Sequence, residues 1–219
     1  MDEITAETGE LYTYDTVPFF FYHRGPALNA APGTGVRAGM LKCAIDEHGM
    51  TPGVERVMRA VAAAHHRTGV PVTVHTHPGT RTGLEVKRVL CDSAGVDPGR
   101  VALAHSGDTT DCDHLAELAD AGFMLGMDRF GINLATTFEA RADTLAEMCR
   151  RGYAERMVLS QDASCYIDWI DPNVMPFLPQ WHYLHIHDEV LPYARAHGVT
   201  EEQIATMLTA NPRRFFEKK

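Results

Sequence analysis

Four residues that can bind metal ions or carry protons lie at or near the ends of short apolar runs, namely Lys42, His75, His105 and Asp162. A neutral imidazole is a good metal ligand, and a carboxylate is a ligand or a proton acceptor. Lys42 lies in the run GMLKC, where burial disfavours an ammonium and favours the neutral amine. A neutral lysine can add carbon dioxide to form a carbamate, which bridges two divalent metal ions. Each residue alone is more often structural, but the four together predict a metal centre.

The sequence that contains these residues alternates short apolar runs with amphipathic helical stretches. This alternation is typical of βα units on a parallel sheet. In a (β/α)8 barrel the catalytic groups come from the C-terminal ends of several strands, whereas a doubly wound dinucleotide fold would need a GxGxxG turn that this sequence lacks. We therefore predict an α/β fold of the (β/α)8 TIM-barrel type, with residues 1–219 as a single domain. The predicted strands are Ala38–Ala44, Val70–His75, Val101–His105, Phe123–Asp128 and Met157–Asp162.

Helices are predicted between these strands from their caps and apolar spacing. After the last strand the sequence predicts a proline-punctuated loop through Pro179, and Asn211-Pro212 is predicted to stop the final helix. The predicted helices are Thr51–Gly69, Gly83–Ala94, Asp111–Ala121, Thr136–Arg151, Asp188–His197 and Thr200–Thr209.

The composition restricts the class of protein and of partner. The chain has 219 residues, 45% of them hydrophobic, which excludes a disordered or low-complexity protein. Its net charge of -9 argues against nucleic acid or an anionic membrane as partner and favours a small molecule. The five cysteines show no framework spacing and are expected as reduced thiols. The N-terminus is acidic and lacks signal-peptide features, so we expect a cytoplasmic protein.

Several segments of the sequence closely resemble the phosphotriesterase family, in particular its phosphotriesterase-like lactonase branch. The resemblance extends from about Leu11 to the C-terminus, and its motifs are specific in order and spacing. The segments are RAGMLKCA (37–44), PVTVHTH (71–77), VALAHSGDT (101–109), GMDRFG (126–131), VLSQDASCYIDW (158–169) and VTEEQIATMLTANPRRFF (199–216).

The resemblance implies a metal-dependent hydrolase of lactones and esters, with organophosphate triesters as further substrates and a metal-bridging hydroxide as nucleophile. It implies two divalent metal ions, zinc or a mixture of iron and zinc, and a homodimer. Lys42 would be the carbamylated bridging ligand, His75 and His105 would bind one metal, and Asp162 would bind the other and accept a proton. The substrate pocket would be lined by Tyr12, Arg129, Cys165 and Trp169.

The sequence departs from the family before Lys42. The family's first strand carries an HxH pair of ligands, and nothing upstream of Lys42 matches it. We expect about six of the eight βα units of a barrel, and therefore open strand edges that another chain could complete. A catalytically inactive or partner-dependent remnant thus stays open as an alternative, as does a mononuclear deaminase, which the DRFG segment and the C-terminal tail disfavour.

Other polar groups have structural interpretations. His185-Ile186-His187 is also an HxH, but it leads into a helix, where residues i and i+2 point to different faces. His77 is expected to be structural, and His182 is expected to be solvated. The acidic residues Asp108, Asp111 and Asp113 are expected to cap a helix rather than to bind calcium.

Overall fold

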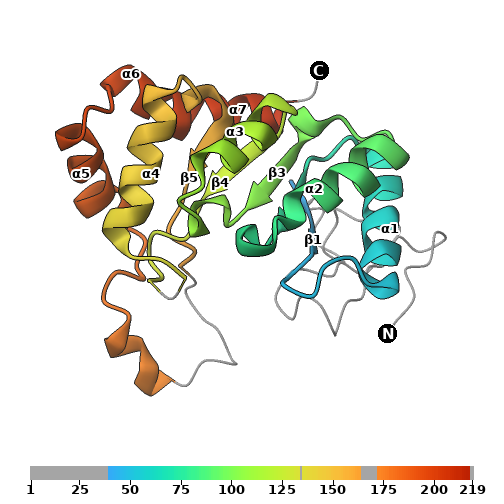
Figure 1. The fold of residues 1–219 in the computed structure, drawn as a ribbon, viewed down its shortest axis with the longest axis horizontal. Coiled ribbons are helices and arrows are strands. Elements are labelled where there is room, and N and C mark those ends of the chain that lie inside the picture. Colours follow the sequence, from blue (N-terminus) through green and yellow to red (C-terminus); the bar gives the residue numbers. More distant parts are fainter. Residues whose placement is uncertain (1–38, 134, 164–171, 218–219) are drawn as a thin grey trace, which may run out of the picture. The chain divides into compact units, whose positions relative to one another are not determined.

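The computed structural model describes residues 39–133, 135–163 and 172–217 (Figure 1). The chain forms two compact units, one of Met1–Leu103 with Phe215–Lys219 and the other of Ala104–Arg214. Adjacent strands follow chain order, β1-β2-β3 in the first unit and β4-β5 in the second. The alternation of strands and helices confirms the predicted α/β fold, and five of the about six expected βα units lie in the described ranges. None of the described helices is long and apolar enough to cross a membrane.

In the first unit, β1 (Leu41–Ala44) and β2 (Val72–His75) are parallel, with Lys42 opposite Thr73 and Ala44 opposite His75. Their connection is α1 (Pro52–Thr68), which packs against β1. The predicted Gly83–Ala94 helix is confirmed as two consecutive segments, α2 (Thr82–Val86) and η2 (Lys87–Ser93), the second with π-type hydrogen bonds. The other elements are η1 (Pro78–Thr80), η3 (Pro98–Arg100) and β3 (Val101–Ala104), whose last residue opens the second unit.

The ends of α1 follow from local sequence signals. The Thr51 hydroxyl accepts a hydrogen bond from the backbone N–H of Val54 at 3.3 Å, which satisfies a donor that the first turn leaves unpaired. Gly69 ends the helix with φ +68°, a left-handed conformation that glycine adopts without steric cost. Both predicted ends are confirmed. Val57, Met58 and Val61 on the inner face of the helix are buried.

In the second unit, β4 (Met124–Met127) and β5 (Met157–Leu159) are parallel, with Leu125 opposite Met157. Helix α4 (Phe138–Arg150) packs against α3 and α5, and Leu125 and Leu145 are fully buried in the core. The other elements are η4 (Ser106–Asp108), α3 (Cys112–Asp120), η5 (Ala154–Arg156), η6 (Pro172–Phe177), η7 (Ile186–Val190), α5 (Leu191–Ala196), α6 (Glu201–Ala205), η8 (Thr206–Ala210) and α7 (Asn211–Phe216).

Two of the predicted strands are too long at their C-terminal ends. β3 ends at Ala104 and β5 at Leu159, so His105 and Asp162 follow the strands rather than belong to them. His105 has φ +67° and Asp162 has φ +57°. A left-handed residue cannot continue an extended strand, and non-glycine residues adopt this region at a cost that functional sites often carry.

The prediction that Asn211-Pro212 stops the last helix is wrong. Helical structure continues from α6 through η8 and α7 to Phe216. The π-type turn η8 ends at Ala210, and Pro212, which has no backbone N–H to donate, is the second residue of α7, a position that tolerates proline. Asn211 is fully buried, and its side-chain amide donates to the carbonyls of Ala154 and Met157 at 2.8 and 2.7 Å.

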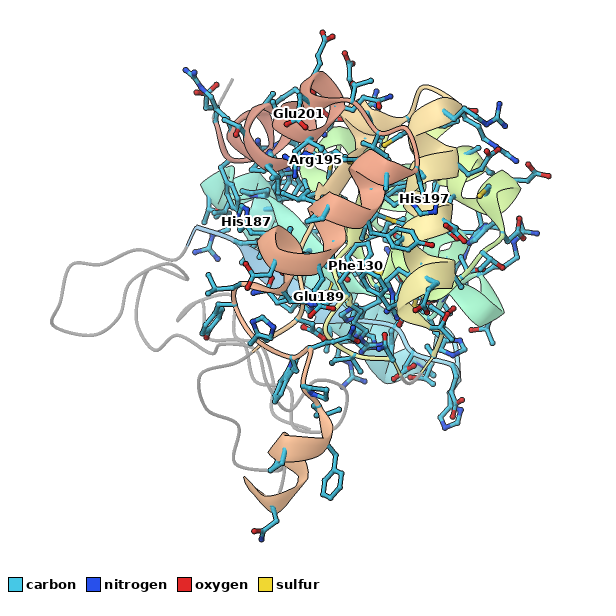
Figure 2. All side chains as sticks on the ribbon, turned by 90° about the vertical axis from the view of Figure 1, so that its left-hand side faces the viewer. Phe130, His187, Glu189, Arg195, His197 and Glu201 are labelled. Atoms are coloured by element: carbon cyan, nitrogen blue, oxygen red, sulfur yellow. The ribbon has the colours of Figure 1, made fainter. Side chains whose placement is uncertain are left out.

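The turn between α5 and α6 is closed by local contacts (Figure 2). Thr200 and Gln203 form a capping box at the start of α6. Arg195 at the end of α5 forms an exposed ion pair with Glu201. These contacts explain why the predicted break between the two C-terminal helices is confirmed.

Candidate active site

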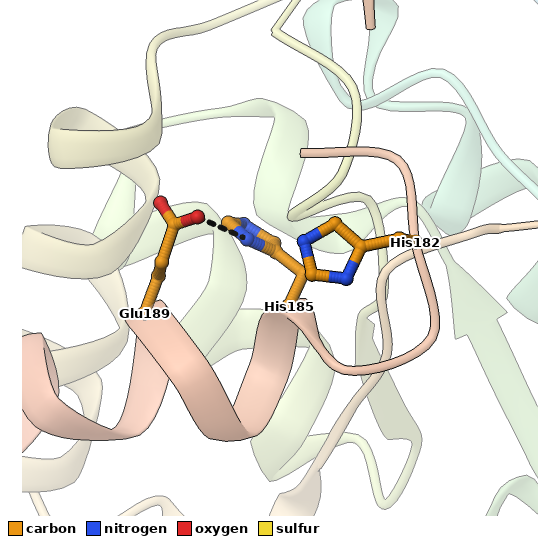
Figure 3. Close-up of side chains that lie close together, drawn as sticks. All are labelled: His182, His185 and Glu189. Carbon is orange, nitrogen blue, oxygen red and sulfur yellow. Dashed lines mark ion pairs between the residues drawn. The ribbon is translucent and has the colours of Figure 1, made fainter. Parts of the chain in front are cut away.

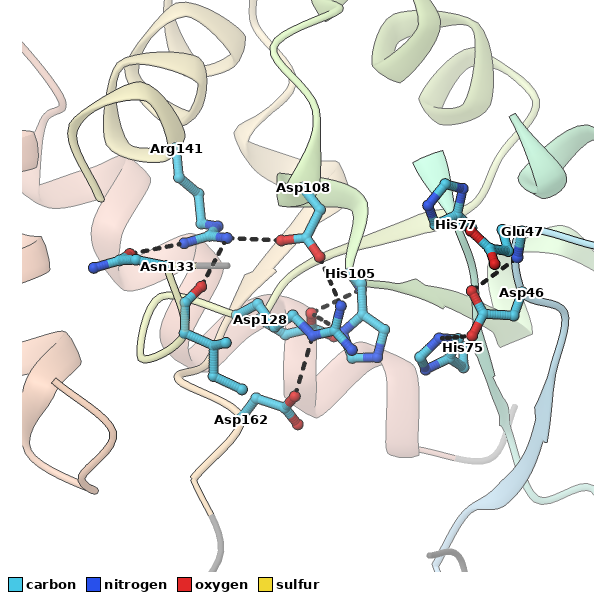
Figure 4. Close-up of polar contacts among 12 residues, drawn as sticks. Asp46, Glu47, His75, His77, His105, Asp108, Asp128, Asn133, Arg141 and Asp162 are labelled. Carbon is cyan, nitrogen blue, oxygen red and sulfur yellow. Dashed lines mark hydrogen bonds and ion pairs between the residues drawn. The ribbon is translucent and has the colours of Figure 1, made fainter. Parts of the chain in front are cut away.

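In the second unit, Asp128 holds His105 in a defined orientation (Figure 4). The Asp128 Oδ1 atom accepts the backbone N–H of His105 at 2.7 Å and lies 3.0 Å from its ring Nδ1. His105 is buried, so this pair is shielded from water. A proton on Nδ1 places the lone pair on Nε2, which is how a carboxylate prepares a histidine for metal binding.

Gly126 allows Asp128 to approach His105. A Cβ atom at this position would lie 2.5 Å from the Asp128 Oδ2 and 3.1 Å from the Cα of Ala104. The first distance is shorter than real Cβ contacts, and the second is tighter than most of them and faces backbone that cannot rotate away. Glycine at position 126 is therefore required by this close approach.

Asp162 is the proton acceptor that the sequence predicts, and it is half-buried. Burial raises the pKa of Asp162; His105 opposes this shift, and the negative charge of Asp128 adds to it. Arg129 Nε lies 3.4 Å from Asp162 Oδ2, and the Trp181 indole N–H donates to the Asp162 carbonyl oxygen. The Asp162 carboxylate is thus more basic than that of an exposed aspartate. Hydrogen bonds position both the backbone and the side chain of Asp162.

Arg129 connects Asp162 to a buried acidic residue. Its Nη1 donates to Asp108 Oδ2 at 2.8 Å, and Arg141 Nη2 donates to Asp108 Oδ1 at 2.7 Å (Figure 4). Burial alone would lower the pKa of Arg129, but Asp108 and Asp162 raise it on balance, so its guanidinium stays charged. The predicted capping role of Asp108 is wrong because its side chain binds two arginines, whereas Asp111 does cap α3 through the backbone N–H of His114.

In the first unit, Lys42 and His75 lie on one face of the β1–β2 pair. Lys42 is opposite Thr73 and Ala44 is opposite His75, and residues two apart in a strand share a face. His75 ends β2, as predicted, and its Nε2 lies 3.6 Å from Asp46 Oδ2. Lys42 does not end its strand, since β1 continues to Ala44. The His77 ring is bound to the Thr80 hydroxyl at 2.9 Å, in keeping with its structural interpretation.

The structure thus places the predicted ligands in two groups, one in each unit. Lys42 and His75 belong to the first unit, and His105 and Asp162 to the second. Sequence reasoning missed Asp128, although it follows a strand by the same rule that selected His105. Sequence reasoning also did not single out Asp46, which lies two residues beyond β1 and close to His75. Tyr12, Cys165 and Trp169 lie outside the described residues.

The residues fit divalent metal ions. Imidazole nitrogens and carboxylate oxygens are the ligands that zinc and similar ions prefer, and N and O donors alone do not select one metal. The His105–Asp128 contact is the carboxylate–histidine pairing that supports metal-binding histidines. Histidine and aspartate residues at or just beyond the ends of parallel strands, and a lysine within β1, thus give the described α/β fold donors that suit a divalent metal ion.

Comparison with known proteins identifies the class of protein. The model of the phosphotriesterase family matches residues 27–216. A phosphotriesterase homology protein of Mycobacterium tuberculosis is 49% identical over 99% of this chain and 71% of its own length. An aryldialkylphosphatase of Saccharolobus solfataricus is 36% identical over 97% of this chain and 71% of its own. The chain belongs to the phosphotriesterase family and is a hydrolase.

Solved structures agree with this assignment. The phosphotriesterase of Mycobacterium tuberculosis superposes with a TM-score of 0.84 at 49% identity, covering 95% of this chain and 69% of that one. A mutant of a phosphotriesterase-like lactonase from Deinococcus radiodurans gives 0.76 at 35% identity, covering 85% and 59%. These similarities support the α/β fold of the (β/α)8 type. They also show that the chain spans between about three-fifths and seven-tenths of these relatives.

Proposed function

We propose that the protein hydrolyses lactones and related esters, with organophosphate triesters as further substrates. The similarity to a lactonase and to an aryldialkylphosphatase supports this range of substrates. The observation that carries the proposal is the position of Asp162, a half-buried carboxylate of raised pKa held beside Arg129. Such a group is suited to accept a proton from water that attacks an ester.

In the first unit the proposed metal ligands are Lys42, as a carbamate, and His75, and in the second unit they are His105 and Asp162. Two divalent ions are expected, with zinc as the metal. When bound, such ions lower the pKa of water to about 7 and polarise the carbonyl or phosphoryl oxygen of the substrate. Asp128 keeps the His105 ring in the orientation that its hydrogen bond sets. Arg129 remains protonated at neutral pH, so its role is to orient Asp162 by charge rather than to move a proton.

The test is hydrolysis of a lactone, an aryl ester and an aryl dialkyl phosphate by Lys42→Ala and Asp162→Asn variants, with metal content measured on each. Asp162→Asn is expected to lose at least about 100-fold in kcat/KM, since general-base loss costs about 10²–10⁴-fold. Lys42→Ala is expected to lose bound metal and activity together, because it removes a proposed ligand. Lys87→Ala and Asp113→Asn are matched controls, because both side chains sit in exposed ion pairs. They are expected to retain full activity.

Retention of hydrolysis by Asp162→Asn would overturn the proposal. Absence of turnover by the unmodified chain, together with one metal equivalent or fewer, would favour the inactive or partner-dependent remnant instead. Release of ammonia from an amine substrate, with no ester hydrolysis, would favour a deaminase.

A further inference from the structure

A second group of metal-binding side chains lies in the second unit, apart from the residues assigned above. His182, His185 and Glu189 each offer a ligand atom, and these atoms lie within 4.8 Å of one another (Figure 3). His185 and Glu189 are four residues apart at the start of a helical segment, which brings their side chains to one face, and His182 reaches them from the turn before it. His185 comes directly before η7, and Glu189 lies within η7.

His185 is the unusual member of this group. Its side chain is fully buried, and neither ring nitrogen has a hydrogen-bond partner among the described residues. Glu189 Oε1 lies 3.5 Å from Nδ1, which is an ion-pair distance rather than a good hydrogen bond. A buried imidazole without a partner costs free energy, and a metal ion is one ligand that removes this cost. Burial lowers the pKa of His185 on balance, against the opposing effects of Glu189 and the Phe130 backbone, and favours its neutral, metal-binding form.

Contacts within and around the group hold its side chains close together. The rings of His182 and His185 have centroids 5.7 Å apart at an interplanar angle of 70°. The Gln180 side-chain amide donates a hydrogen bond to Glu189 Oε2 at 3.1 Å. The other carboxylate oxygen of Glu189, Oε1, faces His185. Zinc binds imidazole nitrogen at about 2.0–2.1 Å and often takes two histidines and one glutamate, with water as a fourth ligand. In the structure the three ligand atoms lie within 4.8 Å of one another, and the side chains would move closer together to bind an ion at such distances.

We propose that His182, His185 and Glu189 form a further site for a divalent transition metal ion, with zinc as the preferred ion. The site is separate from Lys42, His75, His105 and Asp162. It would join the start of η7 to residues 180–182, where Trp181 donates its indole N–H to the carbonyl oxygen of Asp162. A metal ion bound there would stiffen the segment that holds the Asp162 backbone.

The test is equilibrium dialysis of the full chain against Zn²⁺, with Co²⁺ absorption spectra as a second readout. The unmodified chain is expected to bind one equivalent that Lys42→Ala retains and that His182→Ala and Glu189→Gln lose. Losing an outer-shell partner of a metal ligand already weakens binding 10–100-fold. Loss of a ligand is therefore expected to weaken this equivalent at least about 100-fold and to remove its Co²⁺ d–d bands.

His187→Ala is the matched control, because His187 is an exposed histidine of the same turn that lies outside the group. It is expected to bind metal as the unmodified chain does. His182 and Glu189 are not fully buried, so their variants are expected to fold, which circular dichroism will verify. Unchanged stoichiometry and affinity in both His182→Ala and Glu189→Gln would refute the site. Since enzymatic activity is not the readout, this result is independent of the proposed hydrolase reaction.

Discussion

Replacing Asp108 by alanine is expected to destabilise the second unit strongly. The Arg141 side chain is fully buried, and Asp108 is only 5% exposed. Asp108 accepts hydrogen bonds from Arg141 at 2.7 Å and from Arg129 at 2.8 Å. Without Asp108, the Arg141 guanidinium would remain buried, with neutral oxygens such as the carbonyl of Ile132 as its acceptors.

The expected loss of stability follows from the burial of the Asp108–Arg141 ion pair. Removing one partner of a buried ion pair costs about 3–5 kcal/mol of unfolding free energy, because the other charge stays desolvated. For a chain of this size, 1 kcal/mol shifts the thermal midpoint by roughly 2–4 °C, so the midpoint should fall by roughly 6–20 °C. An exposed ion pair contributes at most about 1 kcal/mol.

Thermal unfolding followed by circular dichroism and calorimetry measures this effect. Asp113→Ala is the matched control, since Asp113 is 90% exposed and pairs with Arg151 on the surface. A second variant, Asp108→Ala with Arg141→Met, removes both charges and should recover much of the lost stability. If Asp108→Ala unfolds within about 1 kcal/mol of Asp113→Ala, the argument from burial is wrong.

Three further predictions concern single positions. Gly126→Ala is expected to displace Asp128 from His105 and to lower hydrolysis at least tenfold, measured as kcat/KM, because the new Cβ would lie 2.5 Å from Asp128 Oδ2. Asn211→Ala removes two buried hydrogen bonds, to the carbonyls of Ala154 and Met157, and is expected to cost about 1–3 kcal/mol in urea unfolding; equal midpoints would contradict this. Burial raises the pKa of Cys149 to about 11. Its thiol should therefore resist alkylation at pH 8 until the chain unfolds, and the stability it contributes should fall as the pH rises from about 9 to 11.

The sequence predicted the structure correctly where the determining contacts involve residues close together in the chain. Thr51 and Gly69 mark the ends of α1 because capping and left-handed geometry involve only neighbouring residues. Apolar runs located the strands because burial of a strand requires them. The ends of β3 and β5 were missed because the backbone of His105 and Asp162 turns left-handed, which their residue types do not announce.

The polar side-chain contacts of Asp108 and His185 in the second unit were not predicted from the sequence, for a different reason. Asp108 has the sequence context of a helix cap, but two arginines distant in sequence bind it. His182 and His185 have the pattern of solvated or helical residues, yet His185 is fully buried beside Glu189. Contacts of this kind depend on how helices and loops pack, and a single sequence does not reveal them.

By itself, the sequence determined the alternation of strands and helices, the caps of α1 and the types of residue that could bind metal at the ends of strands. These features depend on spacing and chemistry that are written along the chain. Only the tertiary structure decided that Asp128 orients His105, that Arg129 joins Asp162 to Asp108, and that His182, His185 and Glu189 meet. Each of these contacts joins groups brought together by burial, where an unpaired charge or polar atom costs several kcal/mol and so must find its partner in space rather than in sequence.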